Sequence, residues 1–163
     1  MTVPITSSPA QLRADAAELQ EAVSDLVRIY QFRDRDRICC HDVSVTQAYA
    51  LEALIRRGPC TLNELAADLY LDKSTASRVV TSLERKKYLV REAHPDDARA
   101  TRLEVSAAGK KLHQLIKNDL IQEQEALLAD LDPEVRQGAA VLLRRLTAVV
   151  AARSGVCAPS GCC

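Results

Sequence analysis

The sequence predicts a mainly α-helical protein with one small β-hairpin. Apolar residues recur at helical spacings of three and four along most of the 163-residue chain, and aromatics make up only 3% of it. Strand-like alternation is confined to residues 88–105. Glycine occurs only five times, so long flexible linkers are not expected. The length suits one domain, or one domain with an oligomerisation arm.

Charge and hydropathy limit the classes of protein to consider. The formal net charge is zero, which argues against a purely electrostatic nucleic-acid binder. No apolar run approaches the roughly 18–20 residues that span a membrane, and residues 1–9 lack the pattern of a signal peptide. We therefore expect a cytoplasmic protein with no membrane partner. The motifs of phosphate-binding loops, serine hydrolases and zinc proteases are missing, so we expect no enzyme.

The first element is an amphipathic helix over residues 11–31. Its apolar positions are Leu12, Ala16, Leu19, Val23, Leu26, Val27 and Tyr30. Alternating Arg and Asp at residues 33–37 are expected to end the apolar face, and residues 39–42 to form a junction. We assign residues 10–38 to an N-terminal dimerisation helix.

The next residues predict two short helices joined by a tight turn. A helix from about Ser44 stops at Gly58-Pro59. Thr61 and Glu64 then form a capping box, in which each side chain satisfies a free backbone amide. Asp72 caps a following helix whose inward positions are Ala76, Val79, Val80 and Leu83. Two short helices with a turn of three to four residues are typical of a helix-turn-helix.

A change of period after Lys87 predicts the hairpin. Residues 88–92 and 101–105 favour strands, and the residues between them are polar and turn-prone. A hairpin directly behind a helix-turn-helix is a wing. We therefore assign residues 44–105 to a winged helix-turn-helix DNA-binding domain.

Two further helices follow the wing. One, of about 22–25 residues, starts at Ser106 and is longer than the average globular helix. Asp132-Pro133 begins the second, which ends near Arg153. We assign residues 106–153 to C-terminal dimerisation helices and residues 154–163 to a Cys-rich tail. The apolar stripes of the flanking helices are too broad for the central module to cover, so a homodimer is expected.

The helix after Asp72 carries the candidate DNA-binding residues. Sequence-specific proteins place the N-terminal part of such a helix in the major groove of double-stranded DNA. Its outward polar residues, all hydrogen-bond donors, include Lys73, Ser74, Thr75, Ser77 and Arg78. Five basic residues stand against one acid between residues 73 and 87. Arg99, in the turn of the wing, is expected to enter the minor groove.

Residues 65–91, the wing residues 95–101 and the segment 103–109 together resemble the MarR family of transcription regulators. The resemblance spans roughly residues 15–150. It implies an obligate dimer with interleaved terminal helices, which binds a pseudo-palindromic operator and usually represses transcription. The family's Asp-x-Arg wing motif matches Asp97 and Arg99, whereas Ala98 stands where a second wing arginine is common.

The six cysteines suggest the signal to which the regulator responds. A reducing cytosol makes structural disulfides unexpected. Cys60 is expected to pack in the core. We expect a thiophilic metal or metalloid, namely arsenite, antimonite, mercury, cadmium or zinc, to bind at Cys39, Cys40, Cys157, Cys162 and Cys163. Zinc or cadmium would need a fourth ligand, for which His41 is nearest. No organic cofactor is expected.

Three alternatives remain open at the level of sequence. The resemblance implies effectors that act near the domain junction: a phenolic ligand, a metal or an oxidant. An oxidant could join junction and tail cysteines in a disulfide, and we rank it second; phenolic ligands rank third. Outside regulation, the cysteines would also serve a metal-buffering protein, but that would leave the polar helix face of residues 73–78 unexplained.

Overall fold

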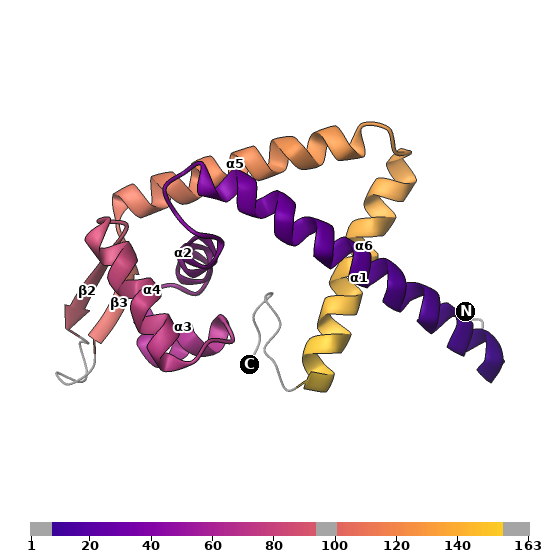
Figure 1. Cartoon of the computed structure of the whole chain (residues 1–163), viewed down its shortest axis with the longest axis horizontal. Coiled ribbons are helices and arrows are strands. Elements are labelled where there is room, and N and C mark those ends of the chain that lie inside the picture. The colour runs from indigo at the N-terminus through magenta and orange to yellow at the C-terminus, as the bar shows by residue number, and fades with distance from the viewer. Residues whose placement is uncertain (1–7, 94–100, 155–163) are drawn as a thin grey trace. The chain divides into compact units, whose positions relative to one another are not determined.

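The computed structural model describes residues 8–93 and 101–154, apart from the side chain of Asp34. It is mostly helical with a small antiparallel sheet, which confirms the predicted fold class. The elements are α1 (Pro9–Cys39), α2 (Val45–Arg57), β1 (Cys60–Thr61), α3 (Leu62–Asp68), α4 (Lys73–Arg85), β2 (Leu89–Ala93), β3 (Thr101–Val105), α5 (Ala107–Leu128) and α6 (Pro133–Ser154) (Figure 1). Residues 1–45 and 46–163 form separate compact units.

The first unit consists of α1, which is longer than its apolar periodicity predicts. Ser8 caps it by accepting a hydrogen bond from the Gln11 amide at 3.2 Å. The helix continues through the Arg-Asp run because that run contains neither Gly nor Pro, and because its arginines find local partners. The Arg33 guanidinium, for example, lies 3.9 Å from the centre of the Tyr30 ring. The helix ends at Cys39, shortly before Asp42, which adopts a left-handed φ of 61°.

The second unit contains the predicted helix-turn-helix, with one strand more than predicted. The sheet order is β1-β3-β2, all antiparallel, with Leu89 opposite Val105 and Cys60 opposite Leu103. The expectation of a simple two-stranded hairpin was therefore incomplete. Strand β1 has only two residues, too few to show an alternating pattern in the sequence.

The core of this unit lies beneath α4. Its fully buried side chains come from α2, α3, α4, β2 and β3 and include Leu51, Leu65, Val80, Leu83, Leu89 and Leu103. On α4, the inward positions Ala76, Val80 and Leu83 are buried as expected, and Val79 is half-buried. Burial of one face of α4 leaves the opposite face free for another molecule.

Helices α5 and α6 differ from this core in their exposure. Ser106 caps α5 by accepting from the Gly109 amide at 3.0 Å, and the first turns of α5 bury Leu112 and Ile116. Beyond Ile116, large apolar side chains on α5 and α6 are exposed, including Ile121, Leu127, Val135, Val141, Leu142, Leu143, Val149 and Val150. Among the described residues, no helix is both long and apolar enough to cross a membrane.

Candidate nucleic-acid interface

Asp72 organises the N-terminus of α4. Its backbone is extended, with φ −67° and ψ 154°, and its carboxylate accepts a hydrogen bond from the Thr75 amide at 2.9 Å. The same carboxylate accepts from the hydroxyl of Ser74 at 2.6 Å and from that of Thr75 at 2.7 Å. These donors hold the pKa of Asp72 well below its usual range, with the Ser74 hydroxyl as the largest cause. The cap predicted from sequence is confirmed, and it involves two of the candidate DNA-binding side chains.

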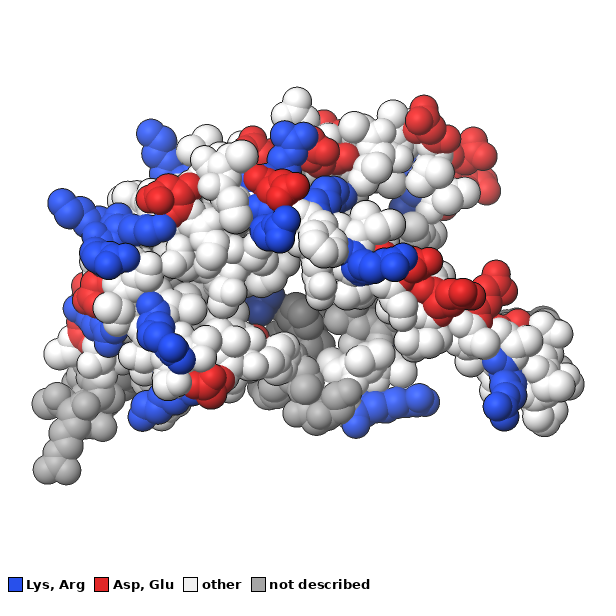
Figure 2. All heavy atoms as spheres, viewed as in Figure 1, with Lys and Arg blue, Asp and Glu red and all other residues white. Residues whose placement is uncertain are grey.

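The remaining candidate residues of α4 lie on its outer face. Lys73, Ser74 and Arg78 are exposed, whereas Thr75 and Ser77 are half-buried. Arg78 lies along the first turns of the helix, where its Nη2 is 3.4 Å from Ser74 Oγ and 3.5 Å from Thr75 Oγ1. Lys and Arg side chains gather over α4, β2 and β3, on the left of Figure 2. A guanidinium among hydroxyl groups on a basic surface can hydrogen-bond to base edges and phosphates.

Two side chains from other elements support the C-terminal half of α4. Gln47 of α2 donates to Ser82 Oγ at 2.9 Å and accepts from Lys86 Nζ at 3.5 Å. Arg91 of β2 donates to Glu84 Oε2 at 2.9 Å and to Thr81 Oγ1 at 3.3 Å. Arg91 thereby balances the negative charge of Glu84, the single acid among residues 73–87. These contacts fix α4 relative to α2 and the wing.

A third contact joins α2 to α3. Arg57, the last residue of α2, donates to both oxygens of Asp68, at 3.0 and 3.1 Å, and to Glu64 Oε1 at 3.0 Å. Glu64 also receives the Thr61 amide at 2.8 Å, which completes the predicted capping box. These bonds, led by that amide, lower the pKa of Glu64. Sequence reasoning missed Gln47, Arg57 and Arg91, because nothing in their spacing marks partners that folding brings near.

The turn between α3 and α4 requires an unusual backbone. Tyr70 has a φ of +54°, a left-handed conformation that is uncommon outside glycine and asparagine. Its amide donates to Ala67 O at 3.1 Å, and the Leu71 amide donates to Ala66 O at 2.9 Å. Tyr70 is 62% exposed. The two backbone bonds fix the turn that sets the angle between the helices.

The cysteines fall into distinct environments. Cys39 and Cys40 are exposed at the end of α1, and the Cys40 thiol donates to Asp36 O at 3.2 Å. Cys60 is 5% exposed on β1, and burial raises the pKa of its thiol to about 11, which confirms its expected packing role. Cys157, Cys162 and Cys163, like Arg99, lie outside the described residues. Within the described ranges, no three His, Cys, Asp or Glu side chains cluster in a way that could hold a metal ion.

The capped α4, its supporting contacts and the strands behind it define a winged helix-turn-helix protein. A MarR family model matches residues 41–100. The transcriptional regulator YxaD of Bacillus subtilis is 29% identical over 96 residues, which are 59% of this chain and 67% of YxaD. A MarR family protein from Bacillus stearothermophilus superposes with a TM-score of 0.77 at 21% identity, covering 82% of this chain and 94% of that one. A mutant of S. aureus MepR bound to an oligodeoxyribonucleotide gives a TM-score of 0.59 at 19% identity, covering 81% and 97%. The chain is therefore similar to the helix-turn-helix transcription regulators of the MarR family.

Proposed function

We propose that the protein is a homodimeric repressor that places the N-terminal turns of α4 in the major groove of a pseudo-palindromic operator. The observation that carries this proposal is the two-sided character of α4. One face is buried in the core, and the other exposes Lys73, Ser74 and Arg78 around the Asp72 cap. The solved MepR complex with an oligodeoxyribonucleotide supports the proposal. Two copies related by a two-fold axis would read two half-sites, with Arg99 of each wing in the adjacent minor groove.

Binding assays on duplex DNA from upstream of the chain's own gene test the role of α4. Arg78→Ala should reduce discrimination between the operator and unrelated DNA by ~1–3 kcal/mol, because a bidentate contact to a base is lost. Lys87→Ala is the matched control, since it removes one exposed charge just beyond the C-terminal end of α4. It should weaken binding to all sequences about equally and reduce the salt dependence by about one charge. A chain with no salt-sensitive binding from nanomolar to micromolar concentration would contradict the proposal.

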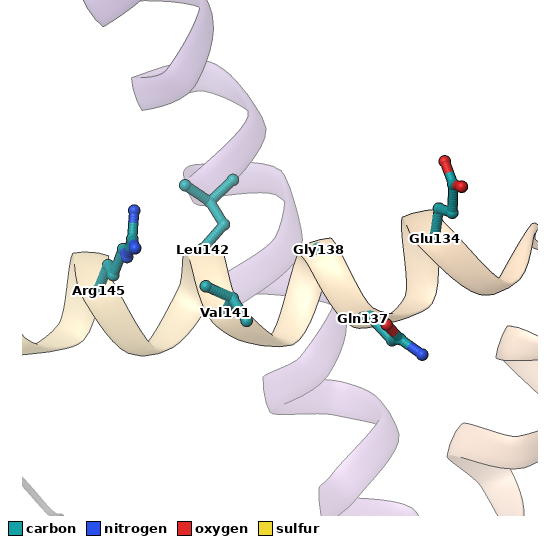
Figure 3. Close-up of a pocket in the computed structure, with 6 residues that line it drawn as sticks. All are labelled: Glu134, Gln137, Gly138, Val141, Leu142 and Arg145. Carbon is teal, nitrogen blue, oxygen red and sulfur yellow. The ribbon is translucent and has the colours of Figure 1, made fainter. Parts of the chain in front are cut away.

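The proposed dimer rests on the exposed apolar faces of the flanking helices. On α6, a shallow groove of about 450 Å³ is lined by Glu134, Gln137, Gly138, Val141, Leu142 and Arg145 (Figure 3). These positions are three and four residues apart, the spacing that forms a hole for a side chain of a second helix. Glycine inside a helix costs ~1 kcal/mol relative to alanine, yet a Cβ at Gly138 would meet nothing within 4 Å. The close approach of a helix from a second copy would account both for a glycine inside α6 and for the open space beside it.

We further propose that a thiophilic metal or metalloid switches operator binding through Cys39, Cys40, Cys157, Cys162 and Cys163. The exposure of Cys39 and Cys40 where α1 ends, in contrast to the buried Cys60, supports their role as ligands. Arsenite or antimonite would bind three thiolates, whereas mercury, cadmium and zinc have other geometries. Ligation would tie the C-terminal tail to the junction after α1 and so change the spacing of the two α4 helices.

Titration of the reduced dimer on its operator tests this switch. Arsenite, antimonite, mercury, cadmium, zinc and peroxide should be compared, with release of labelled DNA as the readout. The double variant Cys39→Ser, Cys40→Ser and truncation after Arg153 should each abolish release by the metal or metalloid and leave DNA binding intact. Cys60→Ala is the control and should respond as the parent chain does. Release by peroxide alone would favour the oxidant alternative, whereas full release from both variants would eliminate the thiol site.

A further inference from the structure

The hydroxyl groups on the outer face of α4 are already engaged within the chain. A hydroxyl carries one hydrogen to donate and two lone pairs to accept. In this structure the hydrogen of Ser74 points to Asp72 Oδ1 and that of Thr75 to Asp72 Oδ2, at oxygen separations of 2.6 and 2.7 Å. The sequence-based view that both side chains act as donors therefore has to be revised. Each oxygen also accepts from Arg78 Nη2, at 3.4 and 3.5 Å, so one lone pair on each oxygen remains free to accept from another molecule.

From this arrangement we infer that Asp72 determines base specificity by making Ser74 and Thr75 acceptors toward the major groove. In that groove only adenine N6 and cytosine N4 present an amino group that can donate, while guanine O6 and N7 and thymine O4 are acceptors. Acceptor oxygens at the start of α4 therefore select a base pair with adenine or cytosine facing them. This inference rests on the proposed placement of α4 in the major groove.

Arg78 supplies the complementary half of the pattern. Its guanidinium carries only hydrogen-bond donors and no accepting atom. Its Nη2 lies 3.4 Å from Ser74 Oγ and 3.5 Å from Thr75 Oγ1. These long contacts keep Arg78 on the same side of the helix as the two hydroxyls. Arg78 can donate only to guanine or thymine edges, and guanine suits its fork best. Each half-site should thus contain an adenine or cytosine, whose amino group donates to a hydroxyl oxygen of α4, next to a guanine that accepts from Arg78.

Asp72 is well suited to this role because two charge-assisted bonds hold the hydroxyl hydrogens. Its cap to the Thr75 amide, at 2.9 Å, adds a third bond to the same carboxylate. Asparagine is an equally good N-cap, so Asp72→Asn should keep the helix start. Asparagine has only one accepting oxygen, however, and its amide nitrogen donates. One of the two hydroxyls is then released and can donate to thymine or guanine.

The test is selection of DNA from a pool of duplexes with randomised half-sites, using the full chain and sequencing of the bound fraction. The parent chain should prefer adenine or cytosine at one position next to a guanine. Asp72→Asn should lower that preference about fivefold and raise the share of thymine or guanine there, the change that corresponds to one hydrogen bond of ~1 kcal/mol. Thr75→Val and Ser74→Ala, which remove one accepting oxygen each, should lose the preference at that position with no gain for thymine or guanine. Asp132→Asn, the same substitution just before α6, should change nothing.

The outcomes separate the inference from the proposed function. If the parent chain shows no salt-sensitive DNA binding, the placement of α4 fails. If the parent chain binds and all three α4 variants keep its base preferences, the role of Asp72 is overturned. If Asp72→Asn does not bind, Thr75→Val and Ser74→Ala decide alone: loss of the adenine or cytosine preference supports the inference, and its retention overturns it.

Discussion

Gly109→Ala is expected to lower the free energy of unfolding by ~1–3 kcal/mol. Alanine normally stabilises a helix relative to glycine, by up to ~1 kcal/mol, so the sign of the effect is reversed here. A Cβ at Gly109 would overlap the carbonyl oxygen of Tyr88 and lie 2.7 Å from Val105 Cγ1. Backbone at the start of β2 would have to move to relieve this overlap. Denaturant unfolding monitored by circular dichroism measures the change.

The backbone movement at Tyr88 caused by Gly109→Ala should also displace the wing. The Tyr88 carbonyl accepts from the Ser106 amide at 3.1 Å, and the Ser106 hydroxyl donates to Lys87 O at 2.7 Å, so α5 and the hairpin share one junction. Operator affinity should therefore fall together with stability. Lys110→Ala, on the next and exposed residue of α5, is the control and should stay within ~0.5 kcal/mol of the parent. If Gly109→Ala is as stable as the parent, Gly109 does not approach Tyr88 this closely.

Local signals explain why the helix-turn-helix could be predicted from the sequence. The caps of α3, α4 and α5 use a side chain that bonds to an amide three residues later, as Thr61, Asp72 and Ser106 do. Both partners of such a bond lie in one short segment, so the residue order alone reveals them. The inward stripe of α4 is equally local, because its period follows from helix geometry.

Non-local contacts explain what the sequence could not reveal. Two pairs of hydrogen-bond partners lie far apart in the sequence: Gln47 with Ser82, and Arg57 with Asp68. The members of each pair meet only when α2 packs beside α3 and α4. Gly109 is a similar case, since its lack of a side chain matters only against Tyr88. The two-residue β1 exists through its pairing with β3 rather than through its own propensity. The placement of Ser74 and Thr75 hydrogens on Asp72 likewise requires side-chain geometry.

Leu142→Glu is expected to separate the proposed dimer and to weaken operator binding by about 100-fold or more. A carboxylate buried without a partner at an apolar interface costs several kcal/mol, and ~2.7 kcal/mol already corresponds to a 100-fold change. In the single chain Leu142 is 55% exposed, so the variant should keep its helical content and fold. A monomer would contact only one half-site, which removes the gain in affinity from simultaneous binding. Sedimentation velocity measures the dimer, and fluorescence anisotropy measures DNA binding.

The interpretation of this variant depends on two comparisons. Leu142→Met preserves the volume and apolar character of the side chain, so it should remain a dimer with operator affinity close to that of the parent. A monomeric Leu142→Glu chain should still bind non-specific DNA weakly, because the exposed face of α4 is unchanged. Retained non-specific binding would show that the substitution leaves α4 intact. The loss of operator affinity would then come from the loss of the dimer, and the groove around Gly138 would face the second copy. If Leu142→Glu sediments as a dimer and binds the operator as tightly as the parent, the dimer forms through a surface other than this face of α6.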